Sequence, residues 1–194
     1  MKKHILIALL ITFVGLGQKL NAQNWGLKTN LIYDATTTMN VGAEFALGKK
    51  WSFDLSGNLN PWTIDGKKLK HWLVQPEIRY WFCDRFQGHF IGAHLLGGSY
   101  NIGYIDTDIK FFGNDYSKLK DHRYQGYFIG AGIAYGYTWA LSKHLNLELE
   151  LGIGYVYTEY DKFECGGCGR KVEENVPYHY FGPTKLALNF MYVF

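Results

Sequence analysis

The chain ends in Thr184-Lys-Leu-Ala-Leu-Asn-Phe-Met-Tyr-Val-Phe194, and no other stretch says more about its architecture. Apolar residues recur here at every second position: Leu186, Leu188, Phe190, Tyr192 and Phe194. A period of two places these side chains on one face of a β-strand, with Lys185, Ala187 and Asn189 on the other. The stretch therefore predicts a strand with one apolar face and one polar or small face, ending on an aromatic residue.

The same alternation recurs along the chain. Composition agrees with strands, since 18% of residues are aromatic and the chain has 23 Gly but only four Pro. The pattern is clearest over 125–139 and 144–159, and it is blurred at Leu95-Leu96-Gly97-Gly98. Eight strands are predicted, near residues 24–33, 38–47, 50–60, 71–83, 88–100, 125–139, 144–159 and 179–194.

The connectors between these segments alternate in length. Short links lie near 48–49, 84–87 and 140–143, and long ones at 61–70, 101–124 and 160–178. Outer-membrane barrels have short periplasmic turns and long extracellular loops. We therefore expect an all-β fold, an eight-stranded antiparallel transmembrane β-barrel, with both ends of the domain in the periplasm.

Alternation alone does not say which face points inward, because a secreted barrel of lipocalin type would show the same period. Volume decides between the two, since an eight-stranded barrel holds only a modest filling of side chains or one small ligand. The large apolar and aromatic residues of all eight strands would overfill it, whereas the Gly, Asn, Ser and Glu of the opposite face would fit. We expect the apolar face to contact lipid, with Tyr and Trp near the strand ends as interfacial girdles.

The amino terminus has the features of a secretory signal. A basic start, Met1-Lys-Lys-His4, precedes an apolar run from Ile5 to Gly17, and Ala22 supplies a small residue at the cleavage position. We expect residues 1–22 to be removed, leaving a barrel domain over 23–194. Three of the 20 Lys and Arg residues lie in the signal and none of the 17 acidic ones does, so the domain is balanced in charge. Nothing in its charge suggests nucleic acid as a partner.

No run after residue 22 reaches the roughly 18 apolar residues that a membrane helix needs. In lipid, every backbone N–H and C=O must be paired within the protein, so a membrane protein without such a helix has to be a closed barrel.

Three resemblances to known barrel proteins make the predicted fold and location more specific. The terminal strand, with Phe190, Tyr192 and Phe194, looks like the signal by which barrel-assembly machinery inserts such proteins. Strand number and loop asymmetry are similar to the OmpA/OmpX-type small barrels over essentially the whole domain. Asn30-Leu-Ile-Tyr-Asp-Ala-Thr-Thr-Thr38, Asn60-Pro-Trp62 and His71-Trp-Leu-Val-Gln-Pro-Glu-Ile-Arg-Tyr-Trp81 resemble a barrel family of unknown function from gut anaerobes. Its members often sit beside fimbrial genes, which implies an outer-membrane location and a link to surface fibres, but no activity and no catalytic residue.

The predicted lumen face carries an unusual number of charges. Counted from the short-turn end, seven of them fall at about one height, four to six residues up, and Lys185 lies higher. His94 is expected to face the same lumen. A salt-bridge network closing the lumen is the favoured reading, because buried charges must be paired; a gated pore or cation site is the alternative. The candidate residues are Lys28, Glu44, Asp54, Glu77, Arg79, His94, Glu148, Glu150 and Lys185.

Two further groups of residues could carry chemistry. A lipid-modifying barrel enzyme would need a His, a Ser and a carboxylate converging near the outer rim, and His71, Ser99 and Glu159 are available without a spacing that favours convergence. Cys165 and Cys168 form one CxxC, which offers two ligands where a closed zinc site needs four. In an oxidising compartment these two thiols favour a disulfide over free thiols or a metal site.

The sequence thus predicts a monomeric barrel with no cofactor, no metal and no catalysis, embedded in outer-membrane lipid. Its expected role is structural or one of surface interaction, in which the long loops meet an extracellular protein, in particular a fimbrial one. Residues 105–124, which mix charges with aromatics, are the predicted contact patch. A lipid-modifying barrel enzyme and a narrow gated channel are the alternatives.

Overall fold

The computed structural model describes residues 23–64, 67–103, 110–111, 114–115, 122–164 and 169–194. The predicted signal over 1–22 and the pair Cys165 and Cys168 lie outside them. The elements are β1 (Trp25–Asn30), α2 (Leu31–Ala35), β2 (Met39–Ala46), β3 (Trp51–Asn60), β4 (Thr63–Ile64), β5 (Lys67–Trp81), β6 (Gly88–Gly103), β7 (Lys110–Phe111), β8 (Asn114–Asp115), β9 (Arg123–Ala140), β10 (Leu145–Phe163) and β11 (Lys171–Val193).

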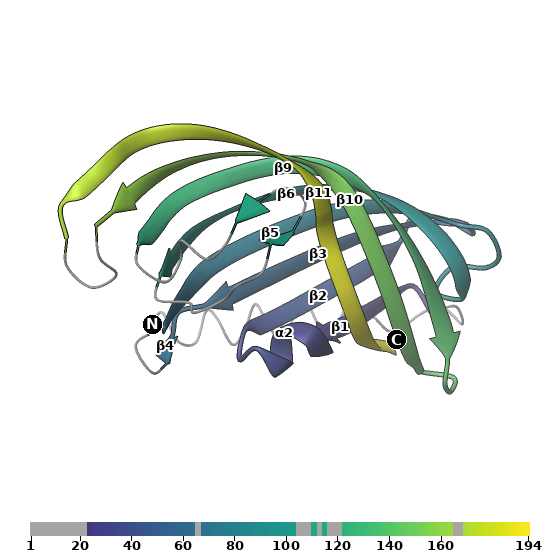
Figure 1. The fold of residues 1–194 in the computed structure, drawn as a ribbon. Helices are drawn as coiled ribbons and strands as arrows, with labels where there is room; N and C mark the ends of the chain where they lie inside the picture. The colour runs from purple at the N-terminus through teal and green to yellow at the C-terminus, as the bar shows by residue number, and fades with distance from the viewer. Residues whose placement is uncertain (1–22, 65–66, 104–109, 112–113, 116–121, 165–168) are drawn as a thin grey trace, which may run out of the picture.

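Eight antiparallel strands hydrogen-bond into a closed ring in the order β1-β2-β3-β5-β6-β9-β10-β11, and β11 pairs with β1 to close it. Figure 1 shows β9, β10 and β11 arching over the top of this ring, with β1, β2 and β3 running beneath. The short β4 only extends the edge of β5, and β7 and β8 pair with each other. The predicted all-β, eight-stranded antiparallel barrel is confirmed. Among the described residues, no helix is long and apolar enough to cross a membrane.

The two ends of the ring differ. The turn end carries the short connectors 47–50, 82–87 and 141–144, and the loop end carries α2 and the longer connectors. The two ends of the domain meet at the turn end, as expected: the backbone N–H of Asn24 donates to the carbonyl of Phe194 at 3.2 Å. The Trp25 and Phe194 rings also stack there, with centroids 4.1 Å apart.

Several predicted boundaries at the loop end are wrong. The first strand does not run to residue 33, because the Asn30 side chain accepts the N–H of Ile32 at 3.1 Å and caps α2 instead. The connector 160–178 is mostly strand, since β10 continues to Phe163 and β11 begins at Lys171. Ion pairing across these strands, such as Lys162 with Glu173 at 3.4 Å, replaces the apolar alternation on which the sequence analysis relied.

The other two predicted long connectors are also shorter than expected. Residues 61–70 contain β4 and the first residues of β5, and residues 101–124 contain the end of β6, the β7–β8 pair and the start of β9. Most of the predicted contact patch over 105–124 lies outside the described residues.

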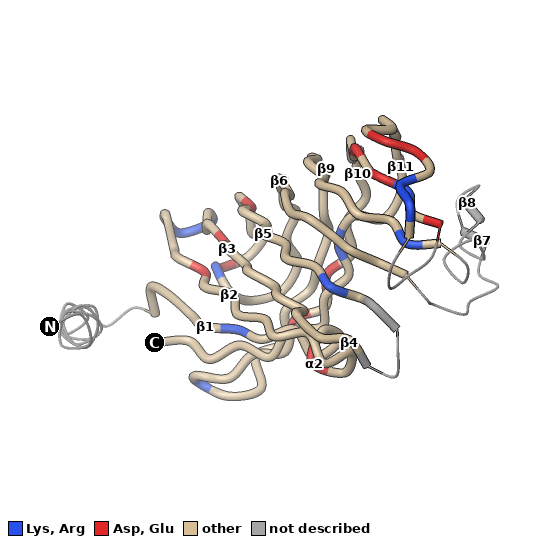
Figure 2. Tube along the Cα trace, turned by 90° about the vertical axis from the view of Figure 1, so that its left-hand side faces the viewer, with Lys and Arg blue, Asp and Glu red and all other residues tan. Residues whose placement is uncertain are grey.

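The two faces of the ring have the opposite polarity to those of a water-soluble protein. Large apolar side chains point outward, as with Ile133 and Phe181, both 66% exposed, and Leu95, 60% exposed. The inward positions of the same strands hold buried polar and charged groups, as with Arg79 and Glu150, both fully buried. Figure 2 shows that further charged residues gather at the loop ends of β10 and β11.

Residues 95–98, where the alternation is blurred in the sequence, still alternate between the outer and inner faces in β6. Leu95 points outward, and the next residue, Leu96, is only 6% exposed. Gly98 lies on the inward side, where a Cβ would come within 2.1 Å of the backbone carbonyl oxygen of Trp72 and 2.8 Å of Phe128. The neighbouring Gly97 has room, because its nearest atom would be 3.9 Å away. Close approach of β6 and β5 therefore requires one of these glycines and not the other.

This difference gives a matched test. Gly98→Ala should destabilise the folded barrel by about 1–3 kcal/mol, because the added methyl group overpacks against backbone. Gly97→Ala should leave stability nearly unchanged. The measurement is the temperature at which the folded, fast-migrating band is lost on unboiled gels. Equal melting of the two variants would contradict the described packing of β6 against β5.

Candidate functional site

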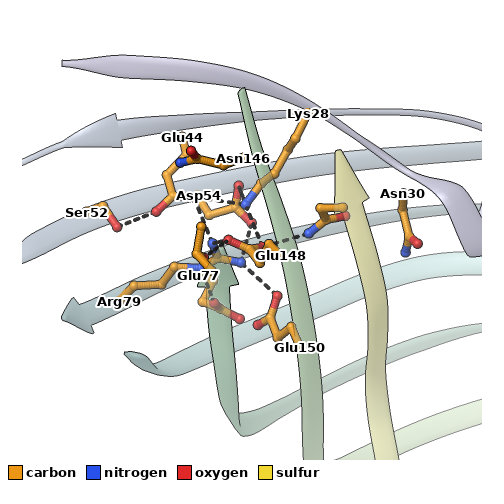
Figure 3. A network of polar contacts seen from close by, with 12 residues as sticks. Lys28, Asn30, Glu44, Ser52, Asp54, Glu77, Arg79, Asn146, Glu148 and Glu150 are labelled. Carbon is orange, nitrogen blue, oxygen red and sulfur yellow. Dashed lines mark hydrogen bonds and ion pairs between the residues drawn. The ribbon is translucent and has the colours of Figure 1, made fainter. Parts of the chain in front are cut away.

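A network of buried charges fills the lumen. Its members come from seven of the eight ring strands, and each is at most 8% exposed. Figure 3 shows Lys28, Asp54, Arg79 and Glu148 pointing toward one another from β1, β3, β5 and β10. The nine residues singled out from the sequence all belong to it: Lys28 (β1), Glu44 (β2), Asp54 (β3), Glu77 and Arg79 (β5), His94 (β6), Glu148 and Glu150 (β10) and Lys185 (β11).

Strand register brings like charges together. Glu44 lies directly opposite Asp54, and Asp54 lies directly opposite Glu77 on the next strand. Like charges at directly opposed positions destabilise a sheet. A cation between the walls has to offset this repulsion.

Arg79 is that cation. Its Nη1 lies 2.7 Å from Glu44 and 2.9 Å from Glu148, its Nη2 lies 2.7 Å from Glu150, and its Nε lies 2.5 Å from Glu77. Asp54 is the most distant partner, at 3.4 Å from Nη2. The planar guanidinium can serve several carboxylates because its five donors are fixed in a fork.

Two lysines flank this centre. Lys28 Nζ lies 2.9 Å from Glu44 and 3.0 Å from Asp54. Lys185 Nζ lies 2.8 Å from Glu77 and 3.1 Å from Glu150. Lys185, expected to lie higher, joins the network beside a register shift between Gly152 and Ile153, where Thr184 is the additional residue of β11.

Neutral side chains complete the hydrogen bonding. Ser52 Oγ donates to Glu44 at 2.5 Å, and the Asn189 amide donates to Glu148 at 2.7 Å. His94 Nε2 lies 2.9 Å from the Thr184 hydroxyl, while its Nδ1 is 3.6 Å from Glu77. The sequence analysis did not single out Ser52, Asn189 or Thr184, although strand alternation already put Asn189 and Ser52 on the inward face.

An apolar plug lies between the network and the turn end. It consists of Trp81, Phe86, Phe90, Met191 and Val193, each at most 2% exposed. The plug is tied to the network, because the Trp81 indole donates to Ser52 at 2.8 Å and the Arg79 guanidinium sits 4.5 Å from the centre of the Phe90 ring. The lumen at this level is packed with side chains, which does not favour a passage through it.

The other candidate residues border one cavity at the loop end, but no hydrogen bond joins them. His71 lies opposite Asn60 on the inward face, whereas Ser99 lies opposite Trp72, a residue that is 48% exposed. Glu159 accepts hydrogen bonds from the hydroxyls of Tyr127 and Tyr157, at 2.9 and 3.3 Å, and not from His71 or Ser99.

Metal and thiol chemistry find no support in the described part of the chain. No group of three or more His, Cys, Asp or Glu side chains there could hold a metal ion. Cys83 is a free, exposed thiol, and the disulfide between Cys165 and Cys168 stays a prediction. Phe190, Tyr192 and Phe194 lie on the outer face, 39 to 47% exposed, and their role as an insertion signal also stays a prediction.

Comparison with known proteins identifies the family of this chain but assigns no activity to it. The model of the family described as "Protein of unknown function (DUF3575)" matches residues 5–194, so the chain belongs to that family. No curated protein and no solved structure matches.

Arg79 should be the most sensitive position in the network. Arg79→Ala removes the shared partner of five buried carboxylates and should cost about 3–5 kcal/mol of folding stability. Arg79→Lys should restore only part of this, because a point charge cannot reach both walls. The melting temperature of the folded band on gels measures both variants.

Arg170→Ala is the matched control, since this arginine is exposed at the loop end and should melt like the wild type. Wild-type melting of Arg79→Ala would mean that water, and not Arg79, balances the carboxylates.

Proposed function

We propose that this protein is an integral outer-membrane β-barrel without catalytic activity, which serves as a structural or surface-interaction element of the cell envelope. The observation that carries the proposal is the inverted polarity of the ring. A protein that buries Arg79 and four glutamates while exposing Ile133, Leu95 and Phe181 has its apolar surface where a water-soluble protein would have polar groups.

The exposed apolar surface has the size and position that lipid would cover. Outward apolar side chains occur on every strand of the ring, and contiguous patches of this extent mark interaction surfaces. A transmembrane strand needs about 9–11 residues. β5, β6, β9, β10 and β11 have 15 to 23 residues, so each could span a bilayer and still project beyond it at the loop end.

Outward aromatic side chains lie near both ends of the strands, where the interfacial girdles of an outer-membrane barrel lie. Near the turn end, outward rings contact one another, as with Trp51 and Tyr80, whose centroids are 5.1 Å apart, and Tyr137 and Trp139, 4.8 Å apart. Tyr127 and Tyr157 lie on the outer face toward the loop end. Amphipathic rings favour the two membrane–water interfaces.

The charged network suits a structural role. It ties seven strands together and lies against a plug of packed apolar side chains. In our proposal the loop end faces the outside, where the paired charges of β10 and β11 meet solvent and an extracellular protein. A fimbrial identity for that protein rests on the family resemblance alone.

Orientation in the membrane gives the direct test. In a chain with Cys83, Cys165 and Cys168 replaced by Ser, a cysteine introduced at Lys171 should react with a membrane-impermeant maleimide on intact cells. Cysteines at Lys49 and Ser142, both in turn-end connectors, should react only after the outer membrane is opened. Labelling of all three on intact cells, or recovery of the chain in the soluble fraction, would contradict the proposal.

A further inference from the structure

A groove of about 880 Å³ crosses the outer wall of the barrel. Two neighbouring rows of outward side chains border it, and each row follows paired residues from strand to strand. The row nearer the turn end takes one apolar or aromatic residue from each of β3, β5, β6, β9, β10 and β11. Its members in that order are Trp51, Tyr80, Ile91, Tyr135, Leu151 and Leu186.

Short side chains give the groove its depth. In the second row, Ala93 lies directly opposite Ile78 on one side and Ile133 on the other, so a single methyl group stands between two long side chains. Gly92 and Gly152 lie in the row beneath, where they contribute no side chain to the lining. A large side chain at the exposed position 93 would therefore fill the groove without entering the lumen.

The groove runs obliquely to the barrel axis. Trp51 is the first residue of β3 and directly follows the turn-end connector 47–50, whereas Leu186 lies well inside β11, which ends at Val193. At about 3.3 Å per residue and a strand tilt of about 40°, Leu186 lies about 18 Å deeper than the turn end of its strand. Half of a bilayer core is about 15 Å thick. The groove thus extends from one membrane interface to about the midplane.

Positive charge gathers at the shallow end of the groove. Lys50 is exposed, and its Nζ lies 6.0 Å from the centre of the Tyr80 ring. This ammonium donates to the carbonyl of Phe82 at 3.2 Å, a neutral acceptor that leaves its charge uncompensated. The two connectors at this place, 47–50 and 82–87, carry three basic residues against one acid, namely Lys49, Lys50 and Arg85 against Asp84.

We propose that the groove binds an acyl chain of an anionic phospholipid, with the lipid phosphate beside Lys50. An apolar groove that begins at a cationic interface and ends near the midplane matches such a lipid in both shape and charge. Burial of the chain favours any lipid by about 0.8 kcal/mol for each methylene group. A basic residue near the surface adds about 1 kcal/mol for an anionic headgroup. The inference rests on the proposed function, which puts the turn end, and hence this lipid, in the periplasmic leaflet.

Native mass spectrometry of the folded barrel, released from detergent micelles, tests the site. The probes are phosphatidylglycerol and phosphatidylcholine with identical palmitoyl chains at equal concentration. We expect one phosphatidylglycerol to be retained, with a preference of about fivefold or more over phosphatidylcholine. Lys50→Ala should abolish this preference. Ala93→Phe should lower retention of both lipids by about fivefold or more, because the added ring occupies the place of the chain.

Two matched variants control for charge and for bulk. Lys143→Ala removes an exposed lysine from the turn-end connector 141–144, and Ala131→Phe adds a ring at an exposed outward position of β9 that does not line the groove. Both should retain lipid like the wild type, and the gel band shift verifies that every variant is folded. No preference in the folded wild type, equal losses in Lys50→Ala and Lys143→Ala, or equal retention by Ala93→Phe and Ala131→Phe would overturn the inference.

Cysteine labelling on intact cells keeps the two proposals separate. A chain that labels as proposed and yet prefers neither lipid refutes only the lipid site. Recovery of the chain in the soluble fraction would instead refute the proposed function, and the lipid site with it.

Discussion

Burial of the Arg79 guanidinium among five carboxylates is the constraint on which the rest of this structure depends. Removing such charges from water costs several kcal/mol for each ion, and only well-placed opposite charges recover it. Seven strands must therefore hold their registers at once, because a slip by one residue would turn that strand's inward charge out to the apolar face. Gly92 shows how tightly the walls fit this centre, since a Cβ there would lie 2.5 Å from a Glu77 oxygen.

The network carries five carboxylates against three permanent cations, and His94 is within reach of Glu77. Full ionisation would leave uncompensated negative charge in a lumen closed by an apolar plug, which favours holding protons within the cluster. The half of the lumen toward the turn end and the half toward the loop end therefore differ in how fully side chains fill them. The turn-end half is filled by charged and apolar side chains, whereas the loop end keeps a cavity of about 480 Å³.

Much of this could be predicted from the sequence because a closed barrel leaves little freedom. The period of two predicted the strands and the inward positions of all nine charged residues, including Glu44 and Asp54. The features that the sequence did not predict depend on side-chain contacts that strand alternation does not describe. Glu148 and Glu150 reach Arg79 across the lumen, which no neighbouring-strand argument describes, and the early end of β1 depends on one Asn30 cap. The loop-end parts of β10 and β11 lack an alternating apolar face, so the sequence pattern predicted a loop there.

Nuclear magnetic resonance of the barrel in bicelles tests the central claim most directly, that the lumen charges are sealed from water while the apolar face meets lipid. A lipid carrying a nitroxide on its acyl chain should broaden the Ile129 and Ile133 methyl signals, which belong to side chains 63 and 66% exposed. The Arg79 Nε–H signal should persist, unaffected by this lipid or by a water-soluble gadolinium chelate. Broadening of the Arg79 signal by the chelate, with the isoleucine methyls untouched by the lipid probe, would contradict the account.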